Sequence, residues 1–103
     1  MYITTFTHFL DEQGDIPKTM PKEARELASF MALVVDEATK EYPEKVCCTD
    51  IRCINPDCNS SIITEFIDND EKIYWGCGDC DNAGIISEWQ GSRWDNINGE
   101  KDD

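Results

Sequence analysis

Two cysteine pairs in the second half of the chain constrain its fold more than any other feature. Cys53 and Cys58 form a CxxxxC pair, Cys77 and Cys80 form a CxxC pair, and the segment between them is long enough for one hairpin. Zinc prefers four thiolates in a tetrahedron, each sulfur about 2.3 Å from the metal. Two short cysteine turns that a hairpin brings together can supply this geometry. The pattern therefore predicts a four-cysteine zinc site.

Cys47 and Cys48 leave a second ligand set open. Cys48 and Cys53 are separated by the same gap as Cys53 and Cys58, so a site that uses Cys48 and Cys53 is arithmetically possible. Residues 55–57, Asn-Pro-Asp, are turn-forming residues that lie inside the Cys53–Cys58 pair. We therefore favour Cys53 and Cys58 as ligands and expect Cys47 and Cys48 to be free thiols.

The CxxC spacing of Cys77 and Cys80 also allows a redox dithiol. A thioredoxin-like site places this motif after a strand and at the start of a helix, within a β-α-β arrangement. Here residues 81–84 are turn-like and a strand-like segment follows, so we expect no helix N-terminus that would lower a thiol pKa. His8 is expected to be an ordinary surface or core residue. No catalytic grouping is found, and the sequence predicts a non-enzymatic protein.

The length of the chain makes a structural metal useful. With 103 residues the chain has room for one domain. A domain of this size buries only about 60–65% of its unfolded surface, and such thin cores commonly need disulfides, a metal or oligomerisation. We find no signal peptide and no stretch near the ~20 apolar residues of a membrane span. We therefore expect a cytoplasmic protein without a membrane partner, where reduced thiols favour metal over disulfides.

Hydrophobic periodicity predicts one long amphipathic helix over residues 21–42. Pro21 suits the first helical position, where its missing N–H does no harm, and Pro43 ends the helix. Apolar side chains recur at i, i+3, i+4 and i+7 and therefore share one face, which we expect to be core. These residues are Leu27, Phe30, Met31, Val34, Val35 and Ala38.

Strands are expected on both sides of this helix. Residues 61–67 and 72–77 are β-branched and aromatic segments around a turn at 68–71, which predicts a hairpin. Residues 84–89 are expected to form a third strand. A short strand is also expected within residues 1–16, where apolar residues partly alternate.

The order of cysteine turn, hairpin, second cysteine turn and third strand resembles a zinc ribbon over residues 51–89. This resemblance implies a three-stranded antiparallel sheet with a structural zinc ion at one end. The expected fold class is α+β, with one amphipathic helix packed on this zinc-ribbon-like sheet and an N-terminal strand that can extend it. We expect a single domain, 1–103, with the N-terminal strand and helix in 1–45, the ribbon-like region in 46–97 and a frayed tail, 98–103.

The C-terminal segment GIISEWQGSRWD, residues 84–95, resembles the signature GxISxWQGxxWD of a small, uncharacterised bacterial protein family. A segment near the start of the chain (Thr7 to Glu12), a helix that begins near a proline and the ribbon-like cysteine region extend this resemblance along most of the chain. Glu88 stands where the family pattern leads us to expect a small residue, often glycine. The family has no established activity, so the resemblance implies organisation and no function.

Trp89 and Trp94 have two interpretations. As core residues they would stabilise a thin domain, since each large aromatic side chain buries about 150–250 Å². Alternatively, with Gln90 and Arg93 they form an exposed loop that binds another protein, because Trp and Arg are enriched at binding hot spots. Gly91 would allow the tight turn that this loop needs.

The charge of the chain narrows the choice of partner. Its formal net charge is -13, whereas binding to nucleic acid takes clustered Lys and Arg. Near the ribbon only Arg52, Lys72 and Arg93 could form such a cluster. The leading hypothesis is a non-enzymatic zinc-ribbon-like module that binds another protein, with zinc as a structural crosslink. A nucleic-acid-binding zinc ribbon is the first alternative and a cysteine redox enzyme the second. The sequence also leaves open whether the chain forms a homodimer.

Overall fold

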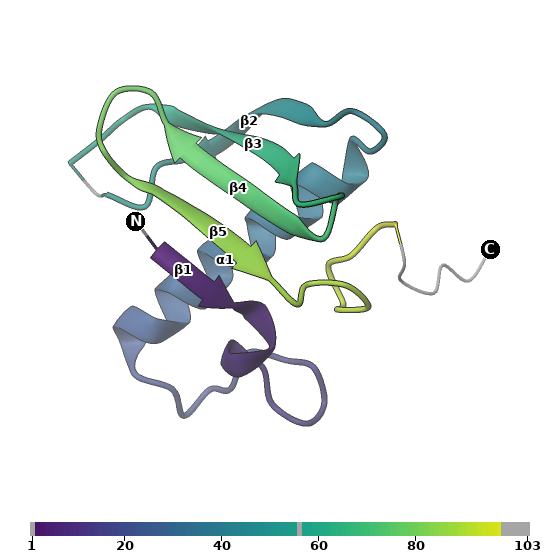
Figure 1. Cartoon of the computed structure of the whole chain (residues 1–103). Coiled ribbons are helices and arrows are strands. Elements are labelled where there is room, and N and C mark those ends of the chain that lie inside the picture. The colour runs from purple at the N-terminus through teal and green to yellow at the C-terminus, as the bar shows by residue number, and fades with distance from the viewer. Residues whose placement is uncertain (1, 56, 98–103) are drawn as a thin grey trace.

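The computed structural model describes residues 2–55 and 57–97, which form one long helix beside a five-stranded sheet (Figure 1). The expected tail, residues 98–103, lies outside the described residues. The elements are β1 (Tyr2–Thr5), the 3-10 helix η1 (Phe6–Phe9), α1 (Lys22–Lys40), β2 (Val46–Arg52), β3 (Ser61–Ile67), β4 (Lys72–Cys77) and β5 (Ala83–Ser87). The α+β class expected from the sequence is confirmed.

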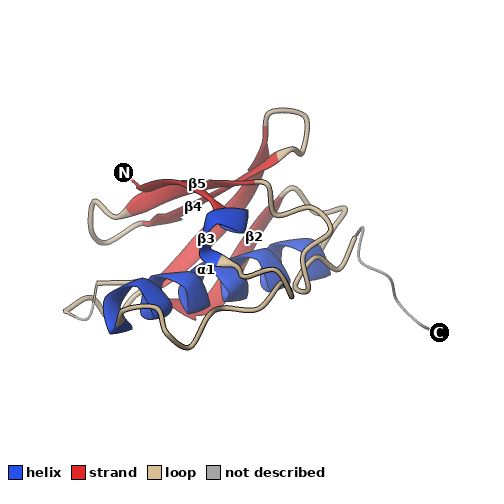
Figure 2. Cartoon of the chain, turned by 90° about the horizontal axis from the view of Figure 1, so that it is seen from below, coloured by secondary structure: helices blue, strands red, loops and turns tan. Residues whose placement is uncertain are grey.

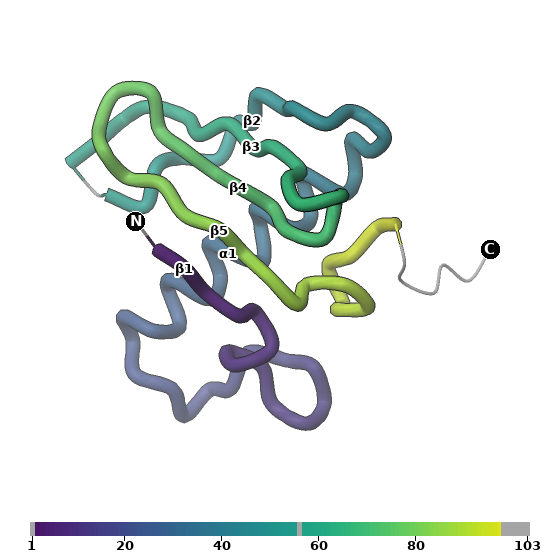
Figure 3. The backbone as a smooth tube through the Cα atoms, in the orientation of Figure 1, coloured from purple at the N-terminus to yellow at the C-terminus, as the bar shows by residue number. Residues whose placement is uncertain are grey.

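The sheet is mixed and larger than the expected three strands. Its order is β1-β5-β4-β3-β2, in which β1 is parallel to β5 and every other pair is antiparallel. The tube in Figure 3 shows the N-terminal strand beside β5. The three expected strands are present as β3, β4 and β5, but β2 was not expected. The N-terminal strand ends at Thr5 because the chain turns there into η1.

Helix α1 covers one face of the sheet with the face that the periodicity predicts (Figure 2). Five of the six predicted residues are buried, and Leu27 is half-buried. Pro21 is the residue before the helix rather than its first residue, because its ψ of 150° is extended. The helix ends at Lys40, before the expected limit at residue 42. The long helix is therefore confirmed with shorter ends.

Trp75 lies at the centre of the layer between α1 and the sheet. Only 1% of its surface is exposed. Its ring meets Phe30 of α1 edge-on, with the ring centroids 4.8 Å apart. Gly84 on the neighbouring strand leaves room for this ring, since a Cβ atom there would lie 2.6 Å from Trp75 Nε1. The Trp75 ring thus packs over the neighbouring strand β5 as well as against α1.

The other face of the sheet is open within the described residues. The β3 side chains alternate, so Ile62 is buried under α1 while Ile63 points to the opposite face and is 42% exposed. Val46 and Ile3 lie on the same open face and are 54% and 77% exposed. One face of the sheet is therefore packed and the other presents apolar side chains to solvent.

Candidate metal centre

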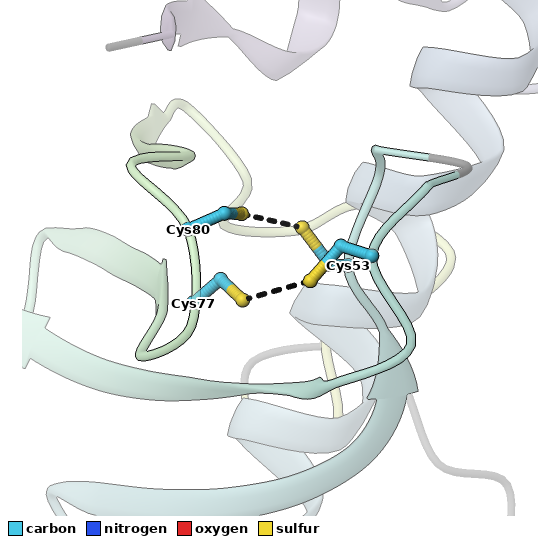
Figure 4. Close-up of side chains that lie close together, drawn as sticks. Cys53, Cys77 and Cys80 are labelled. Carbon is cyan, nitrogen blue, oxygen red and sulfur yellow. Dashed lines mark hydrogen bonds between the residues drawn. The ribbon is translucent and has the colours of Figure 1, made fainter.

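Four cysteines from two loops meet at one end of the sheet. Cys53 directly follows β2 and Cys58 lies in the loop to β3, while Cys77 ends β4 and Cys80 lies in the loop to β5. All four Sγ atoms lie within 4.8 Å of one another. Figure 4 shows Cys77 and Cys80 facing Cys53 across the gap between the loops. The cluster that the sequence predicts is therefore formed.

The sulfur separations fit one metal ion. Four sulfurs at about 2.3 Å from a central zinc are about 3.8 Å apart. Here Cys53 and Cys80 are 3.4 Å apart, and Cys58 and Cys77 are 3.5 Å apart, measured between Sγ atoms. A disulfide requires an S–S distance of about 2.05 Å, and all four are free thiols. The four sulfurs are therefore close enough to share one metal ion and too far apart to form two disulfides.

The first cysteine turn is held by its own backbone. The Cys58 amide donates to the Asn55 carbonyl oxygen at 2.9 Å, and the Asp57 amide donates to Asn55 Oδ1 at 3.0 Å. The Cys53 amide donates to the Ser60 carbonyl oxygen at 2.9 Å, which closes the base of the loop. Asn55 thus provides the turn that the Asn-Pro-Asp sequence predicts, and it brings Cys53 and Cys58 to the same side.

The second cysteine turn is closed in the same way and is tied to the first. The Cys77 amide donates to the Asn82 carbonyl oxygen at 3.0 Å. Asn82 Nδ2 lies 3.7 Å from Cys53 Sγ, and the Ser60 hydroxyl donates to the Asp79 carboxylate. The hydrogen bond between Ser60 and Asp79 joins the two loops without a sulfur atom, so the contact between the loops does not depend on the thiols alone.

Backbone amides favour the thiolate form of these cysteines, while crowding opposes it. The Asp79 amide N–H lowers the pKa of Cys77 to about 7. The Asn82 amide N–H also favours the Cys80 thiolate. However, hydrogen bonds to the other thiols, first Cys53, together with burial raise the pKa of Cys80 to about 12. At neutral pH Cys77 is therefore the more readily ionised of these two cysteines, while Cys80 stays protonated.

The pKa of Cys58 is subject to the same two opposing influences. The Ser60 amide N–H favours its thiolate, but the hydrogen bond with Cys77 and burial leave the pKa of Cys58 raised. Several thiolates repel one another at these distances unless a cation lies among them. The amide N–H groups that point at three of the sulfurs are suited to anionic ligands of a cation, so the donor set fits a metal ion.

The other candidate ligands lie outside the cluster. Cys47 and Cys48 lie near the start of β2, and His8 is exposed in η1. Burial, and then the carboxylates of Glu41 and Glu37, raise the pKa of the Cys47 thiol, so it stays protonated near neutral pH. The alternative ligand set with Cys48 is not formed.

Both tryptophans of the C-terminal signature pack inward. Trp89 is 1% exposed, and its Nε1 donates to the Glu71 carbonyl oxygen at 3.1 Å. The half-buried Trp94 meets Phe6 edge-on, with the ring centroids 5.5 Å apart. The packing interpretation of these residues therefore agrees with their positions. An exposed tryptophan pair, which the partner-binding interpretation requires, is not formed.

The remaining residues of the signature close its turn. Gln90 and Arg93 are exposed; Gln90 Nε2 donates to the carbonyl oxygen of Glu71 at 2.8 Å, and Arg93 Nη1 lies 2.6 Å from Asp15 Oδ1. Asp95, which is 1% exposed, accepts the amide of Gly91 at 2.8 Å. The role of Asp95 was not predicted from the sequence, although its place at the end of the signature was a signal.

A groove between α1 and β2 was also missed. Its volume is about 810 Å³, and side chains of both elements line it, among them the 54% exposed Leu33. Leu33 is apolar and lies outside the predicted core stripe of the helix, which was the available signal. The groove itself depends on how α1 sits against β2, and the sequence did not predict β2.

Comparisons with known proteins add no assignment to this geometry. Within residues 2–55 and 57–97 no helix is both long enough and apolar enough to cross a bilayer. The family resemblance of the C-terminal signature stays a prediction. The chain matches no family model, no curated protein and no solved structure.

Proposed function

We propose that this chain is a non-enzymatic protein-interaction module whose fold is crosslinked by one structural zinc ion. The observation that carries the proposal is the convergence of four Sγ atoms, from two loops, within 4.8 Å. Zinc accepts four thiolates in a tetrahedron, and a site filled by four protein ligands has no position left for water or substrate. The ion would join the loop after β2 to the loop after β4.

The ligand set narrows the choice of metal. Tetrahedral sites of four sulfurs hold zinc or iron, because both suit soft thiolate ligands. Zinc has no redox chemistry and serves as a crosslink, which agrees with a site that the protein closes completely. Iron in the same site would give a coloured protein, so the two metals are distinguishable by eye and by mass.

Native mass spectrometry of protein purified without chelator tests the zinc site. We expect one zinc ion per chain, lost in acid together with the fold, because structural zinc contributes roughly 10–16 kcal/mol in small zinc peptides. The Cys58→Ser variant should lose the metal, whereas Cys48→Ser, which changes an exposed thiol of β2, should retain it. A metal-free protein that unfolds at the same urea concentration as the metal-loaded one would contradict the structural role.

The interaction role is supported by the apolar side chains that the fold leaves exposed. Leu33 on α1 and the open face of the sheet, with Ile3, Val46 and Ile63, are accessible to a partner. A pull-down of the metal-loaded protein that recovers no specific partner would count against this part of the proposal.

The nucleic-acid alternative has less support. Two of the three basic residues near the ribbon are already in ion pairs, Lys72 with Asp68 at 3.6 Å and Arg93 with Asp15 at 2.6 Å. Arg52 alone does not form the basic patch that phosphate contacts need. We expect flat fluorescence anisotropy with single- and double-stranded DNA and with RNA at low salt.

The redox alternative predicts reactive thiols. In a four-cysteine cluster Cys77 and Cys80 are each close to a cysteine of the other loop, and the strand β5 follows them instead of a helix. We expect no thiol–disulfide exchange activity in the metal-loaded protein. Activity that is lost in Cys77→Ser would favour the redox enzyme.

A further inference from the structure

We propose that Asn82 positions Cys53 as a ligand of the metal ion, by donating a hydrogen bond from its side-chain amide to Cys53 Sγ. Asn82 does not belong to the four-cysteine ligand set and acts through Cys53, as a positioning residue. This inference deepens the zinc site proposed above and rests on it. It names a residue outside the cysteines that determines how tightly the site holds its ion.

Cys53 is the cysteine of the cluster that most needs a hydrogen-bond donor from the protein. Its exposed fraction is 6%, whereas the other three cysteines of the cluster are half-buried. A thiolate that binds metal carries negative charge, and a charged group away from water is costly unless hydrogen bonds satisfy it. Water can solvate the half-buried sulfurs, but Cys53 depends on groups of the protein.

The two cysteine loops are built on the same backbone pattern. Ser60 and Asn82 each lie two positions after the second cysteine of their pair. The carbonyl oxygen of Ser60 accepts the amide of Cys53 at 2.9 Å. The carbonyl oxygen of Asn82 accepts the amide of Cys77 at 3.0 Å. The amides of Ser60 and Asn82 also donate to the sulfur of the second cysteine of their own pair. Ser60 and Asn82 therefore occupy equivalent places in the two loops.

The side chains of Ser60 and Asn82 both cross to the opposite loop, but they end on different groups. The Ser60 hydroxyl donates to the Asp79 carboxylate, whereas Asn82 Nδ2 lies 3.7 Å from Cys53 Sγ. Figure 4 shows Cys53 and Cys80 facing each other from the two loops. One crossing contact thus joins the loops through oxygen atoms, and the other reaches a candidate ligand atom.

A side-chain amide is suited to this position because a thiolate can only accept hydrogen bonds. The NH₂ group of Asn82 supplies the donor. Hydrogen bonds to a charged acceptor are roughly twice as strong as neutral ones. Partners of this kind orient the ligands of a metal ion, and their loss typically costs about 10–100-fold in metal affinity.

Substitution of Asn82 changes its side-chain contact and leaves its backbone contacts with the cluster in place. Asn82→Ala removes both the donor and the bulk of the side chain. Asn82→Leu removes the donor and keeps nearly the same volume. The two variants therefore separate the hydrogen bond to Cys53 from the packing of the side chain.

Binding of Co²⁺ to the metal-free protein tests this inference, because Co²⁺ bound to thiolates gives a sulfur-to-metal absorption band. In competition with a chelator, we expect Asn82→Ala and Asn82→Leu to bind Co²⁺ about 10–100-fold more weakly than the unchanged protein. The band should also move to longer wavelength in both, because a sulfur that loses a hydrogen bond gives up an electron more easily. Asn59→Ala, at an exposed residue of the first loop, is the matched control and should change neither.

A third variant, Ser60→Ala, separates the hydrogen bond to sulfur from the general contact between the loops. It loses the contact with Asp79 and retains the contact between Asn82 and Cys53. We expect its absorption band to stay at the wavelength of the unchanged protein. A band that moves equally in Ser60→Ala and in Asn82→Ala would show that the shift reports the geometry of the loops, and it would overturn the inference.

Two further results would overturn the role of Asn82 while the metal centre stands. One is an Asn82→Ala protein that binds Co²⁺ as tightly as the unchanged protein does. The other is a weakened Asn82→Ala beside an Asn82→Leu of normal affinity, which would assign the effect to packing. An unchanged protein that binds neither Co²⁺ nor zinc contradicts the metal centre itself, and this inference with it. The two failures are therefore distinguishable.

Discussion

Glu88 holds a backbone conformation that glycine adopts more easily. Its φ is 55°, in the left-handed region, directly after β5 ends at Ser87. The side chain is exposed, so no burial holds it there. For a residue with a Cβ atom this conformation brings Cβ close to a backbone oxygen. The small residue that the family pattern leads us to expect at this position therefore has a physical reason.

Replacing Glu88 by glycine should stabilise the protein. We expect Glu88→Gly to raise the free energy of unfolding by about 1 kcal/mol, because it removes the left-handed strain. Urea unfolding of the metal-loaded protein measures the change. Gly91→Ala is the matched control, since Gly91 has a φ of 78°, and it should shift stability by a similar amount in the opposite direction. A destabilised Glu88→Gly would mean that the Glu88 side chain contributes a favourable contact.

The sequence indicated that the tryptophans of the C-terminal signature are important for folding or for binding. It did not show whether they are buried or exposed. Trp89 and Trp94 are equally suited to a core or to a binding loop by composition. Their burial depends on Glu71 and Phe6, which are distant in the sequence. The cysteine cluster was easier to predict, because two short cysteine turns joined by a hairpin are a common arrangement for a metal site.

At the scale of elements, a helix or strand could be predicted only where it has a clear local sequence pattern. The helix was predictable because its apolar stripe repeats over many turns. β2 was missed because its pairing with β3 is irregular between Cys48 and Arg52. There the Thr49 hydroxyl donates to the Ile62 carbonyl oxygen at 2.8 Å, in the buried layer. A strand with a polar residue at a buried position does not show the alternation of apolar and polar residues by which strands are recognised in a sequence.

The cysteine turns should bind metal less tightly as the pH falls. In the metal-free protein Cys58, with a raised pKa, and Cys80, with a pKa of about 12, are protonated at neutral pH. A metal ion must displace these protons, so lower pH opposes binding. We expect the apparent affinity to fall at least about a hundredfold per pH unit, because two or more protons are released. Below the pKa of Cys77, about 7, a further proton is displaced and the dependence steepens.

Competition with a chromophoric chelator, from about pH 6 to about pH 8, measures this dependence. Cys47→Ser is the control, because Cys47 lies outside the cluster and its replacement should leave the curve unchanged. An affinity that does not change with pH would show that the bound ligands are not these thiols.

At the scale of the whole molecule, one aromatic contact joins the two ends of the described chain. Phe6 is fully buried, and it meets Trp94 edge-on. η1 also packs on α1. The contact therefore fixes both the N-terminal segment and the C-terminal turn to the same core, and neither segment is expected to stay in place without the other.

Truncating Phe6 should loosen both ends together. We expect Phe6→Ala to lower the free energy of unfolding by about 3–5 kcal/mol, as for other buried aromatic residues. Hydrogen exchange should become faster in β1 and also in residues 89–97. Thr7→Ala, at an exposed neighbour, should leave both unchanged. Faster exchange in β1 alone would show that Phe6 does not stabilise the C-terminal turn.

The arrangement of the whole sheet was beyond the sequence patterns. Each strand of the central hairpin has its partner nearby in the chain, so periodicity and turn residues suffice to predict the pair. The pairing of β1 with β5 has no such local signal. The groove and the open sheet face follow from this larger arrangement, so neither could be predicted from segments taken singly.

The parallel pairing of β1 with β5 has a consequence for the order of folding. The Thr4 hydroxyl donates a hydrogen bond to the carbonyl oxygen of Ile85, which lies 81 positions away in the chain. Contacts between such distant residues carry a high loop-closure entropy and slow the folding of small domains. During synthesis β1 leaves the ribosome first, yet its partner strand follows both cysteine turns. We therefore expect the four thiols to come together, and to bind the proposed metal ion, before β1 pairs with β5.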